Sequence, residues 1–178
     1  MSRLLGVTMT SAFLALGTAT TYALLNLIGP LALPQSLTVM FVAWLGEHYV
    51  SGKGYYYYTP YNGLFVGRVP TWIPLMWVFV VQGGLLLFLS FGFAGVSAAV
   101  ASGIFCALLD LAFIEPYLSA RKTLWHWTPV HAGYFAFIPS KANRFTAPPG
   151  NYIVWFVFPA LLNVLLITAT FVLEIGLG

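Results

Sequence analysis

Long stretches without a charged residue set the first constraint on this chain. Residues 4–46 and 69–109 contain no Asp, Glu, Lys or Arg. Charged residues make up 6% of the 178 residues, whereas a soluble domain carries roughly 25%. So few charges cannot cover a water-facing surface. The composition therefore excludes an ordinary soluble enzyme, a disordered chain and, with one cysteine, a disulfide scaffold. Seven scattered cations also form no basic stripe for nucleic acid.

The apolar stretches are long enough to cross a bilayer several times, and Pro30, Pro34 and Gly92 divide them. Because one crossing takes about 20 apolar residues, the sequence predicts an all-α, polytopic membrane helix bundle that forms a single domain over residues 1–178. Five transmembrane helices are expected, at residues 4–28, 31–50, 69–90, 94–114 and 151–172. The first of these is expected to be a retained helix and not a cleaved signal peptide.

The basic residues indicate how the bundle is oriented. Five helices would place the N-terminus and the loops 51–68 and 115–150 on one side of the membrane. Every Lys and Arg then falls on that side: Arg3, Lys53, Arg68, Arg121, Lys122, Lys141 and Arg144. The positive-inside rule makes that side cytoplasmic. We expect a multi-pass protein of the cytoplasmic (plasma) membrane with its N-terminus inside the cell.

Small residues recur every four positions in the fourth expected helix, at Gly95, Ala99 and Gly103. Such a row lets a neighbouring backbone approach closely. The neighbour is expected to be another helix of the same chain, and the alternative is a homodimer interface.

The few acidic residues point to a functional site, because a carboxyl group is costly in lipid. Asp110 lies inside the fourth expected helix, Glu115 lies near its end, and Glu47 ends the second. All three map to the cytoplasmic-side layer. The alternative is a structural role as partners of nearby cations, namely Lys53, Arg68, Arg121 and Arg144.

Aromatic residues gather in the same layer, including Tyr56, Tyr58, Trp77, Trp125 and Trp127. The alternative is an aromatic belt at the lipid headgroups, but a belt should appear on both faces. A carboxylic acid beside aromatic faces is suited to protonating a carbon–carbon double bond, because the rings stabilise the resulting carbocation. Water then adds to give an alcohol, or a proton leaves to give an isomer.

Other chemistries have weaker support in the sequence. No dinucleotide, nucleotide or nucleophile-elbow motif is present, and no cofactor or metal is expected. The histidines His48, His126 and His131 show no helical ligand spacing. A metal site formed by His126 and His131 with Asp110 or Glu115 is the alternative.

An ordered set of short motifs resembles the carotenoid hydratase family, the membrane proteins that include bisanhydrobacterioruberin hydratase. The set covers roughly two thirds of the chain, from about Phe41 to Trp155. Its members are Gly54-x-Tyr56-x-Tyr58, Val69-Pro70-x-x-Ile73-Pro74-x-x-Trp77, Asp110, Glu115-Pro116, Trp125-x-Trp127, Gly133-Tyr134-Phe135, Ile138-Pro139, Asn143 and Trp155.

The resemblance implies hydration of the terminal double bond of a linear carotenoid or related isoprenoid, without a redox cofactor. The expected partners are a lipid-soluble polyene or isoprenoid ligand and membrane lipids. We expect Asp110 to donate the proton and Glu115 or Glu47 to orient water. The expected substrate-binding residues are Tyr56, Tyr58, Trp77, Trp125, Trp127 and Asn143.

This chain departs from the family because it is shorter and has fewer helices. One alternative is therefore a non-catalytic subunit of a larger membrane complex, or a homo-oligomer, that binds pigment, lipid or quinone. A small transporter that uses Asp110 for protons is a further alternative, although the sequence has no inverted repeat.

Overall fold

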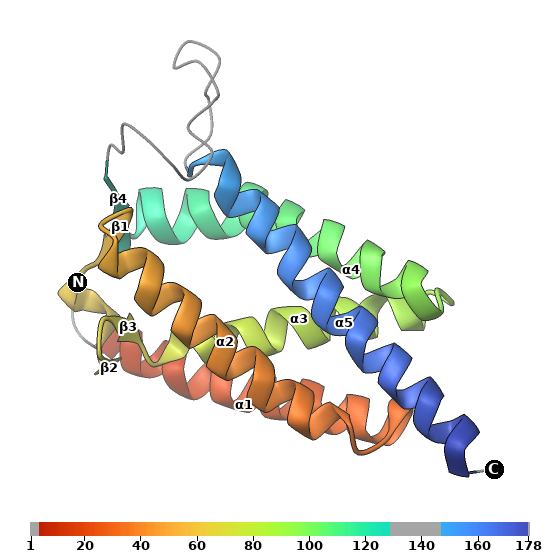
Figure 1. Ribbon diagram of the computed structural model, residues 1–178. Helices are drawn as coiled ribbons and strands as arrows, with labels where there is room; N and C mark the ends of the chain where they lie inside the picture. Colours follow the sequence, from red (N-terminus) through yellow and green to blue (C-terminus); the bar gives the residue numbers. More distant parts are fainter. Residues whose placement is uncertain (1–3, 129–146, 178) are drawn as a thin grey trace.

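The computed structural model describes residues 4–128 and 147–177, and within them it is mostly helical. The helices are α1 (Leu4–Ile28), α2 (Ala32–Gly52), α3 (Trp72–Ser90), α4 (Gly95–Leu109) and α5 (Pro149–Leu177). A π-helical segment, η2 (Asp110–Arg121), continues directly from α4. The elements form one elongated bundle in which consecutive helices run in opposite directions (Figure 1).

Among the described residues, four helices are long and apolar enough to cross a membrane, which identifies an integral, multi-pass membrane protein. These are Leu4–Ile28, Trp72–Ser90, Gly95–Arg121 and Pro149–Leu173. The second expected helix forms as α2, but it is not among the four. Polar residues such as Gln35, Glu47 and His48 lower its mean hydropathy.

All the described loops with strands lie at one end of the bundle (Figure 1). Strands β1 (Tyr56–Tyr58) and β4 (Trp125–Trp127) pair there in antiparallel register, and β2 (Phe65–Val66) pairs with β3 (Val69–Pro70). A short 3-10 helix, η1 (Pro60–Asn62), lies between β1 and β2. The opposite end carries the turns between α1 and α2 and between α3 and α4, where Gly29 and Gly92 adopt positive φ angles.

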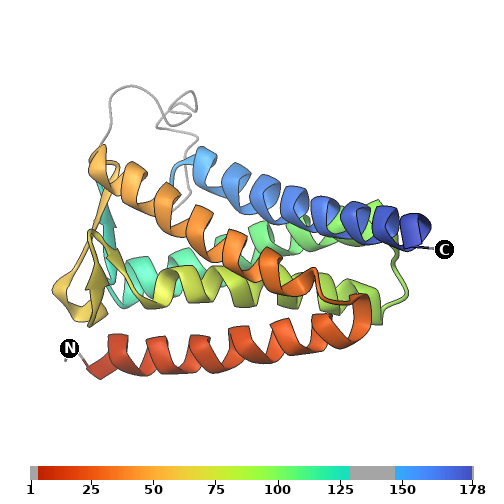
Figure 2. The same cartoon turned by 60° about the horizontal axis from the view of Figure 1, so that its bottom comes forward.

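Helix α3 runs through the middle of the bundle (Figure 2) and supplies more buried residues than any other described element. In the expected small-residue row on α4, Gly103 packs against α5 of the same chain, whereas a Cβ atom added at Gly95 would have no atom within 4 Å. A Cβ atom added to Gly103 would lie 2.6 Å from the Phe156 carbonyl oxygen and 2.8 Å from the Ala160 Cβ. Glycine is therefore required for the two backbones to approach this closely.

Polar side chains connect all five helices near the middle of the bundle. Gln82 on α3 accepts a hydrogen bond from Thr21 on α1 (2.8 Å) and donates one to Gln35 on α2 (3.2 Å). Gln35 donates to Asn163 on α5 (2.8 Å), which donates to Ser102 on α4 (2.8 Å). Each amide has a partner, as burial in an apolar bundle requires.

The fourth expected helix does not end near residue 114, as the sequence analysis predicted, but continues as η2 to Arg121. Pro116 suggested a helix end because proline lacks an N–H group and its ring clashes with the preceding turn. The wider π-helix, whose hydrogen bonds run from residue i to i+5, accommodates the proline inside the helix.

Candidate functional site

The β1–β4 ribbon covers one side of a buried polar cavity. Its register places Tyr56 opposite Trp127 and Tyr58 opposite Trp125. Because alternate residues of a strand point to opposite faces, these four side chains share the face that lines the cavity. Tyr57 pairs with His126 on the other face and is 56% exposed.

Glu47, in the last turns of α2, is held by three donors. The hydroxyl groups of Tyr56 and Tyr58 both donate to its Oε2 atom, the latter at 2.7 Å. The Trp77 indole on α3 donates to Oε1 at 3.2 Å. Burial, followed by the proximity of the Glu47 carboxylate, raises the pKa of Tyr58 well above its ordinary value. Tyr58 therefore remains a protonated donor to Glu47 across the physiological range.

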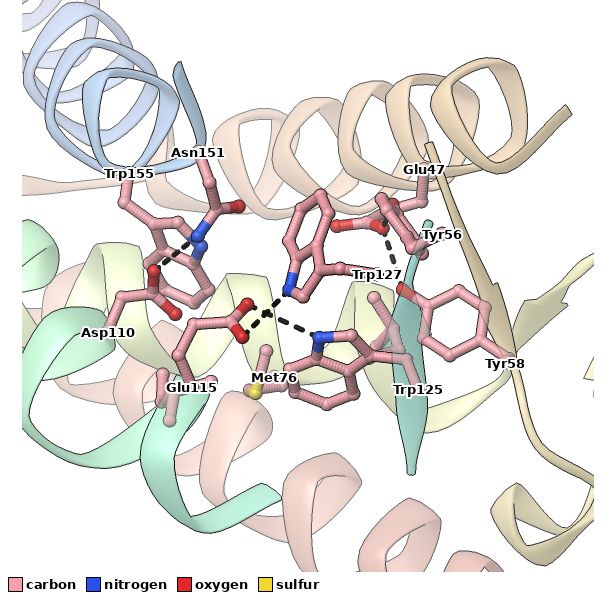
Figure 3. A pocket seen from close by; sticks show the side chains of 12 residues that line it. Glu47, Tyr56, Tyr58, Met76, Asp110, Glu115, Trp125, Trp127, Asn151 and Trp155 are labelled. Atoms are coloured by element: carbon pink, nitrogen blue, oxygen red, sulfur yellow. Dashed lines mark hydrogen bonds between the residues drawn. The ribbon is translucent and has the colours of Figure 1, made fainter. Parts of the chain in front are cut away.

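Glu115 on η2 is 2% exposed and receives two indole hydrogen bonds from the ribbon. The Trp125 Nε1 atom donates to Oε1 at 3.3 Å, and the Trp127 Nε1 atom donates to Oε2 at 3.0 Å. Figure 3 shows both N–H groups directed at the carboxylate. Each oxygen of Glu115 thus accepts one hydrogen bond.

Asp110, the first residue of η2, is fully buried. Its Oδ2 atom accepts a hydrogen bond from the Asn151 amide on α5 at 2.6 Å. Its Oδ1 atom has no hydrogen-bond partner among the described residues. Buried polar atoms are nearly always paired, so this oxygen is available to a molecule that enters the cavity.

The π-helix explains how Asp110 and Glu115 reach the same cavity. Residues five apart on an α-helix of 3.6 residues per turn point about 140° apart. In a π-helix, the i to i+5 hydrogen bonds bring such residues close to one side. Both carboxyl groups line the cavity, and Figure 3 shows them side by side on this segment.

The cavity brings together three carboxyl groups, an amide and aromatic rings from α2, α3, η2, α5 and the ribbon. The space that water-sized molecules can occupy is about 30 Å³, enough for one or two waters. The lining residues are Glu47, Tyr56, Tyr58, Ile73, Met76, Asp110, Ile114, Glu115, Trp125, Trp127, Asn151 and Trp155.

Aromatic rings enclose this space and contact one another. The Trp77 ring stacks on Trp155 with a centroid distance of 3.9 Å. The Tyr56 ring meets the edge of Trp127 at 4.8 Å. Faces of this kind attract a positive charge through the ring quadrupole. The site can therefore supply protons, bind water and accommodate a cationic centre.

Most residues singled out from the sequence meet at this site. Glu47, Asp110 and Glu115 line it, and so do the two tyrosines and two tryptophans of the ribbon. Trp77 donates a hydrogen bond to Glu47, which lines the cavity. Asn143 lies outside the described residues, so its expected role is not addressed by the structure.

The alternative role of the acids, as partners of nearby cations, has no support in the described residues. Within residues 4–128 and 147–177, no Lys or Arg forms an ion pair with Glu47, Asp110 or Glu115, which accept hydrogen bonds from phenol, indole and amide groups. Among the same residues, no group of three His, Cys, Asp or Glu side chains is placed to hold a metal ion. His126 points away from the cavity with Tyr57, and His131 lies outside the described part.

Asn151 and Met76 line the cavity but were not predicted from the sequence, and Trp155 was given no role in the site. Asn151 had one signal, since it is a polar residue at the start of an otherwise apolar helix. Its partner could not be inferred, because Asp110 is 41 positions away in the chain. Met76 gives no signal among the apolar residues of α3.

Comparisons with known proteins give no relative for this chain. No family model, no curated protein and no solved structure matches it.

Proposed function

We propose that this protein is a membrane enzyme that adds water to a terminal carbon–carbon double bond of a carotenoid or related isoprenoid. The observation that carries the proposal is the Asp110 carboxyl group in a buried cavity walled by aromatic rings, with one oxygen that has no hydrogen-bond partner among residues 4–128 and 147–177. The motif resemblance to carotenoid hydratases supports the choice of substrate.

Asp110 is the proton donor in this proposal, because it differs from the two glutamates in its hydrogen bonds. Both oxygens of Glu47 and both oxygens of Glu115 accept hydrogen bonds, as ionised carboxylates do. The Oδ1 atom of Asp110 has no hydrogen-bond partner in the described part of the chain, so it can carry a proton and direct it into the cavity. A donor placed within hydrogen-bond reach of the reacting atom is the first requirement of general acid catalysis.

The reaction proceeds by protonation followed by capture of the cation. The alkene π electrons form a new C–H bond with the Asp110 proton, which leaves a carboxylate and a tertiary carbocation. Aromatic faces, including those of Trp127 and Trp155, stabilise the cation. Water forms the C–O bond while Glu115 or Glu47 accepts its proton, and that proton finally returns to Asp110. The net change is alkene plus water to a tertiary alcohol.

Orientation in the membrane follows from the positions of the charges. The four described cations lie at the end of the bundle that carries the cavity, namely Lys53, Arg68, Arg121 and Lys122. By the positive-inside rule, we assign this end and the N-terminus to the cytoplasmic side of the plasma membrane. Helix α2 is the fifth span in this arrangement, because it runs between the same two ends as its neighbours (Figure 1).

The proposal is tested by supplying the purified protein with a linear polyene that ends in an isopropylidene group. The wild-type protein should give a product one water molecule heavier, detected by mass spectrometry. Asp110→Asn, which keeps the shape of the side chain, should abolish the product while still binding the polyene. Tyr57→Phe, on the outward face of the ribbon, is the control and should keep full activity.

Equal turnover by Asp110→Asn would contradict the assignment of the acid. A wild-type protein that binds the polyene stoichiometrically without converting it would favour the second candidate, a pigment-binding subunit of a larger membrane complex.

A further inference from the structure

An apolar groove adjoins the carboxyl cavity on the side where α2 and α5 face each other. The space that water-sized molecules can occupy in it is about 220 Å³, compared with about 30 Å³ in the cavity. Apolar residues from the two helices form most of its lining, namely Val42, Ala43, Gly46, Val50, Val154 and Phe158. The groove is therefore suited to an apolar chain and offers few groups to a polar ligand.

The groove and the cavity adjoin each other, because the same three side chains line both. These are Glu47, Tyr56 and Asn151. Glu47 is fixed by its tyrosine and tryptophan donors, and Asn151 is the partner of Asp110. An apolar chain lying in the groove would thus have its end against the hydrogen-bonded groups that surround the acid.

The mouth of the groove opens on the apolar side of the bundle. Val42 on α2 is 40% exposed and Val154 on α5 is 43% exposed. Their neighbours Leu45 and Val157 are also exposed apolar residues. Since membrane helices present such side chains to lipid, the mouth faces the bilayer. The β1–β4 ribbon covers the cavity at the end of the bundle (Figure 1).

The two helices separate toward the cavity. They are joined near the middle of the bundle, where Gln35 on α2 donates hydrogen bonds to Asn163 and to the carbonyl group of Leu162 on α5. From there α2 and α5 diverge toward the end that carries the ribbons (Figure 1). The groove occupies this diverging region.

One residue of the groove lining on α2 is a glycine, Gly46. It precedes Glu47 in the chain and is exposed to the groove. A Cβ atom added at Gly46 would have no atom within 4 Å. Neither close helix packing nor a positive φ angle therefore requires glycine here, and a larger side chain would extend into the groove.

We infer that the groove between α2 and α5 is the entrance through which the end of an apolar chain passes from the bilayer to the carboxyl cavity, and that Gly46 sets the width of this entrance. The inference rests on the proposed function for the identity of the chain as the substrate. The entrance itself rests on the groove, its lipid-facing mouth and the three shared side chains.

The test measures binding and turnover separately in Gly46→Leu. Binding of a linear polyene hydrocarbon to the protein in lipid nanodiscs is followed by quenching of tryptophan fluorescence, since Trp77 lines the groove. We expect affinity and turnover to fall about tenfold or more, because filling a site with extra methylene groups forces its contents to shift. Leucine favours helix more than glycine does, so the variant should remain folded, which thermal unfolding checks.

Two further variants make the result specific. Leu45→Phe adds bulk to the same helix on the lipid-exposed surface and should leave binding unchanged. Val42→Phe narrows the groove from an exposed position, so it should weaken binding and serves if Gly46→Leu fails to fold. The proposed entrance would be contradicted if both Gly46→Leu and Val42→Phe kept the wild-type affinity for the polyene. It would also be contradicted if Leu45→Phe lost as much affinity as they do.

The binding assay also separates this inference from the proposed chemistry. Asp110→Asn should bind the polyene normally, because the groove does not include Asp110. If the wild-type protein forms no product but Gly46→Leu still loses affinity, hydration is wrong and the entrance stands. If the wild-type protein is active and Gly46→Leu keeps its affinity and its KM, the entrance is wrong and hydration stands.

Discussion

The three carboxyl groups of the cavity differ in their hydrogen bonds, and this difference assigns their roles. Glu47 is held by two phenols and an indole, and Glu115 is held by two indoles. Because both oxygens of each glutamate accept hydrogen bonds, these two groups are the candidate acceptors of a proton from water. Among the residues that the structure describes, Asp110 has a single amide donor and one oxygen without a hydrogen-bond partner. One cavity thus contains both a candidate acid and candidate bases.

The Tyr58 hydroxyl group leads to a prediction about how the free energy of unfolding depends on pH. Its raised pKa, caused by burial and then by Glu47, means that folded Tyr58 keeps its proton at a pH where an unfolded tyrosine loses it. Because the unfolded chain then binds fewer protons, the free energy of unfolding should fall as the pH rises above about 10. Tyr58→Phe should reduce this fall, as measured by thermal unfolding over that pH range in detergent. Tyr57→Phe is the exposed control, and an identical pH dependence in all three proteins would contradict the prediction.

At the residue scale, the sequence predicted which acidic side chains lie together better than it predicted their hydrogen-bond partners. Glu47, Asp110 and Glu115 were recognisable because acids are rare in apolar helices. The nearby cations were the alternative partners, and the structure instead gives phenols, indoles and Asn151. Asn151 lies 41 positions from Asp110. The tyrosines and tryptophans of the ribbon are only 9 to 12 positions from their acids, but the pairing of the two strands, which the sequence does not reveal, brings them to the same cavity.

At the scale of elements, two features build the site, namely the π-helix η2 and the β1–β4 ribbon. The π-helix turns Asp110 and Glu115 toward one side. The ribbon places two tyrosines and two tryptophans on its inner face. The Tyr-x-Tyr and Trp-x-Trp spacing has the period of a strand, but a strand's partner is set by the tertiary fold. The sequence analysis therefore expected loops in both places.

The two faces of the ribbon should respond differently to substitution. Trp127→Phe keeps a ring but removes the N–H group that donates to Glu115. A hydrogen bond to a charged group contributes about 1.5–3 kcal/mol, so turnover should fall about tenfold to a hundredfold. His126→Ala, one residue away on the outer face, should keep normal turnover. Loss of activity in His126→Ala would contradict this assignment and would revive a role for that histidine as a ligand.

At the scale of the whole molecule, hydrogen bonds between buried side chains join the five helices, and α2 and α5 separate at one end of the bundle. The amide network that includes Gln35, Gln82 and Asn163 joins all five helices. Beyond it, α2 and α5 separate around the groove and the cavity (Figure 1). The sequence predicted the helices well, because apolar length and turn residues are local features. It did not predict the separation, which depends on packing between helices far apart in the chain.

The proposed orientation can be tested by cysteine labelling, because the native Cys106 is fully buried and should not react. Single cysteines at the exposed positions Lys53 and Arg121 should react with a membrane-impermeant thiol reagent only from the cytoplasmic side. Cysteines at Pro30 and Phe91, in the turns at the other end, should react only from outside. Labelling of Lys53→Cys and Pro30→Cys from the same side would show that α2 does not span the membrane.

The most direct test of the account is to run the reaction in water labelled with heavy oxygen and to analyse the product by mass spectrometry. Hydration through Asp110 predicts a tertiary alcohol whose new oxygen carries the label in the wild-type protein, and no such product from Asp110→Asn. An unlabelled or absent product in the wild-type protein, or equal labelled product from Asp110→Asn, would contradict the account.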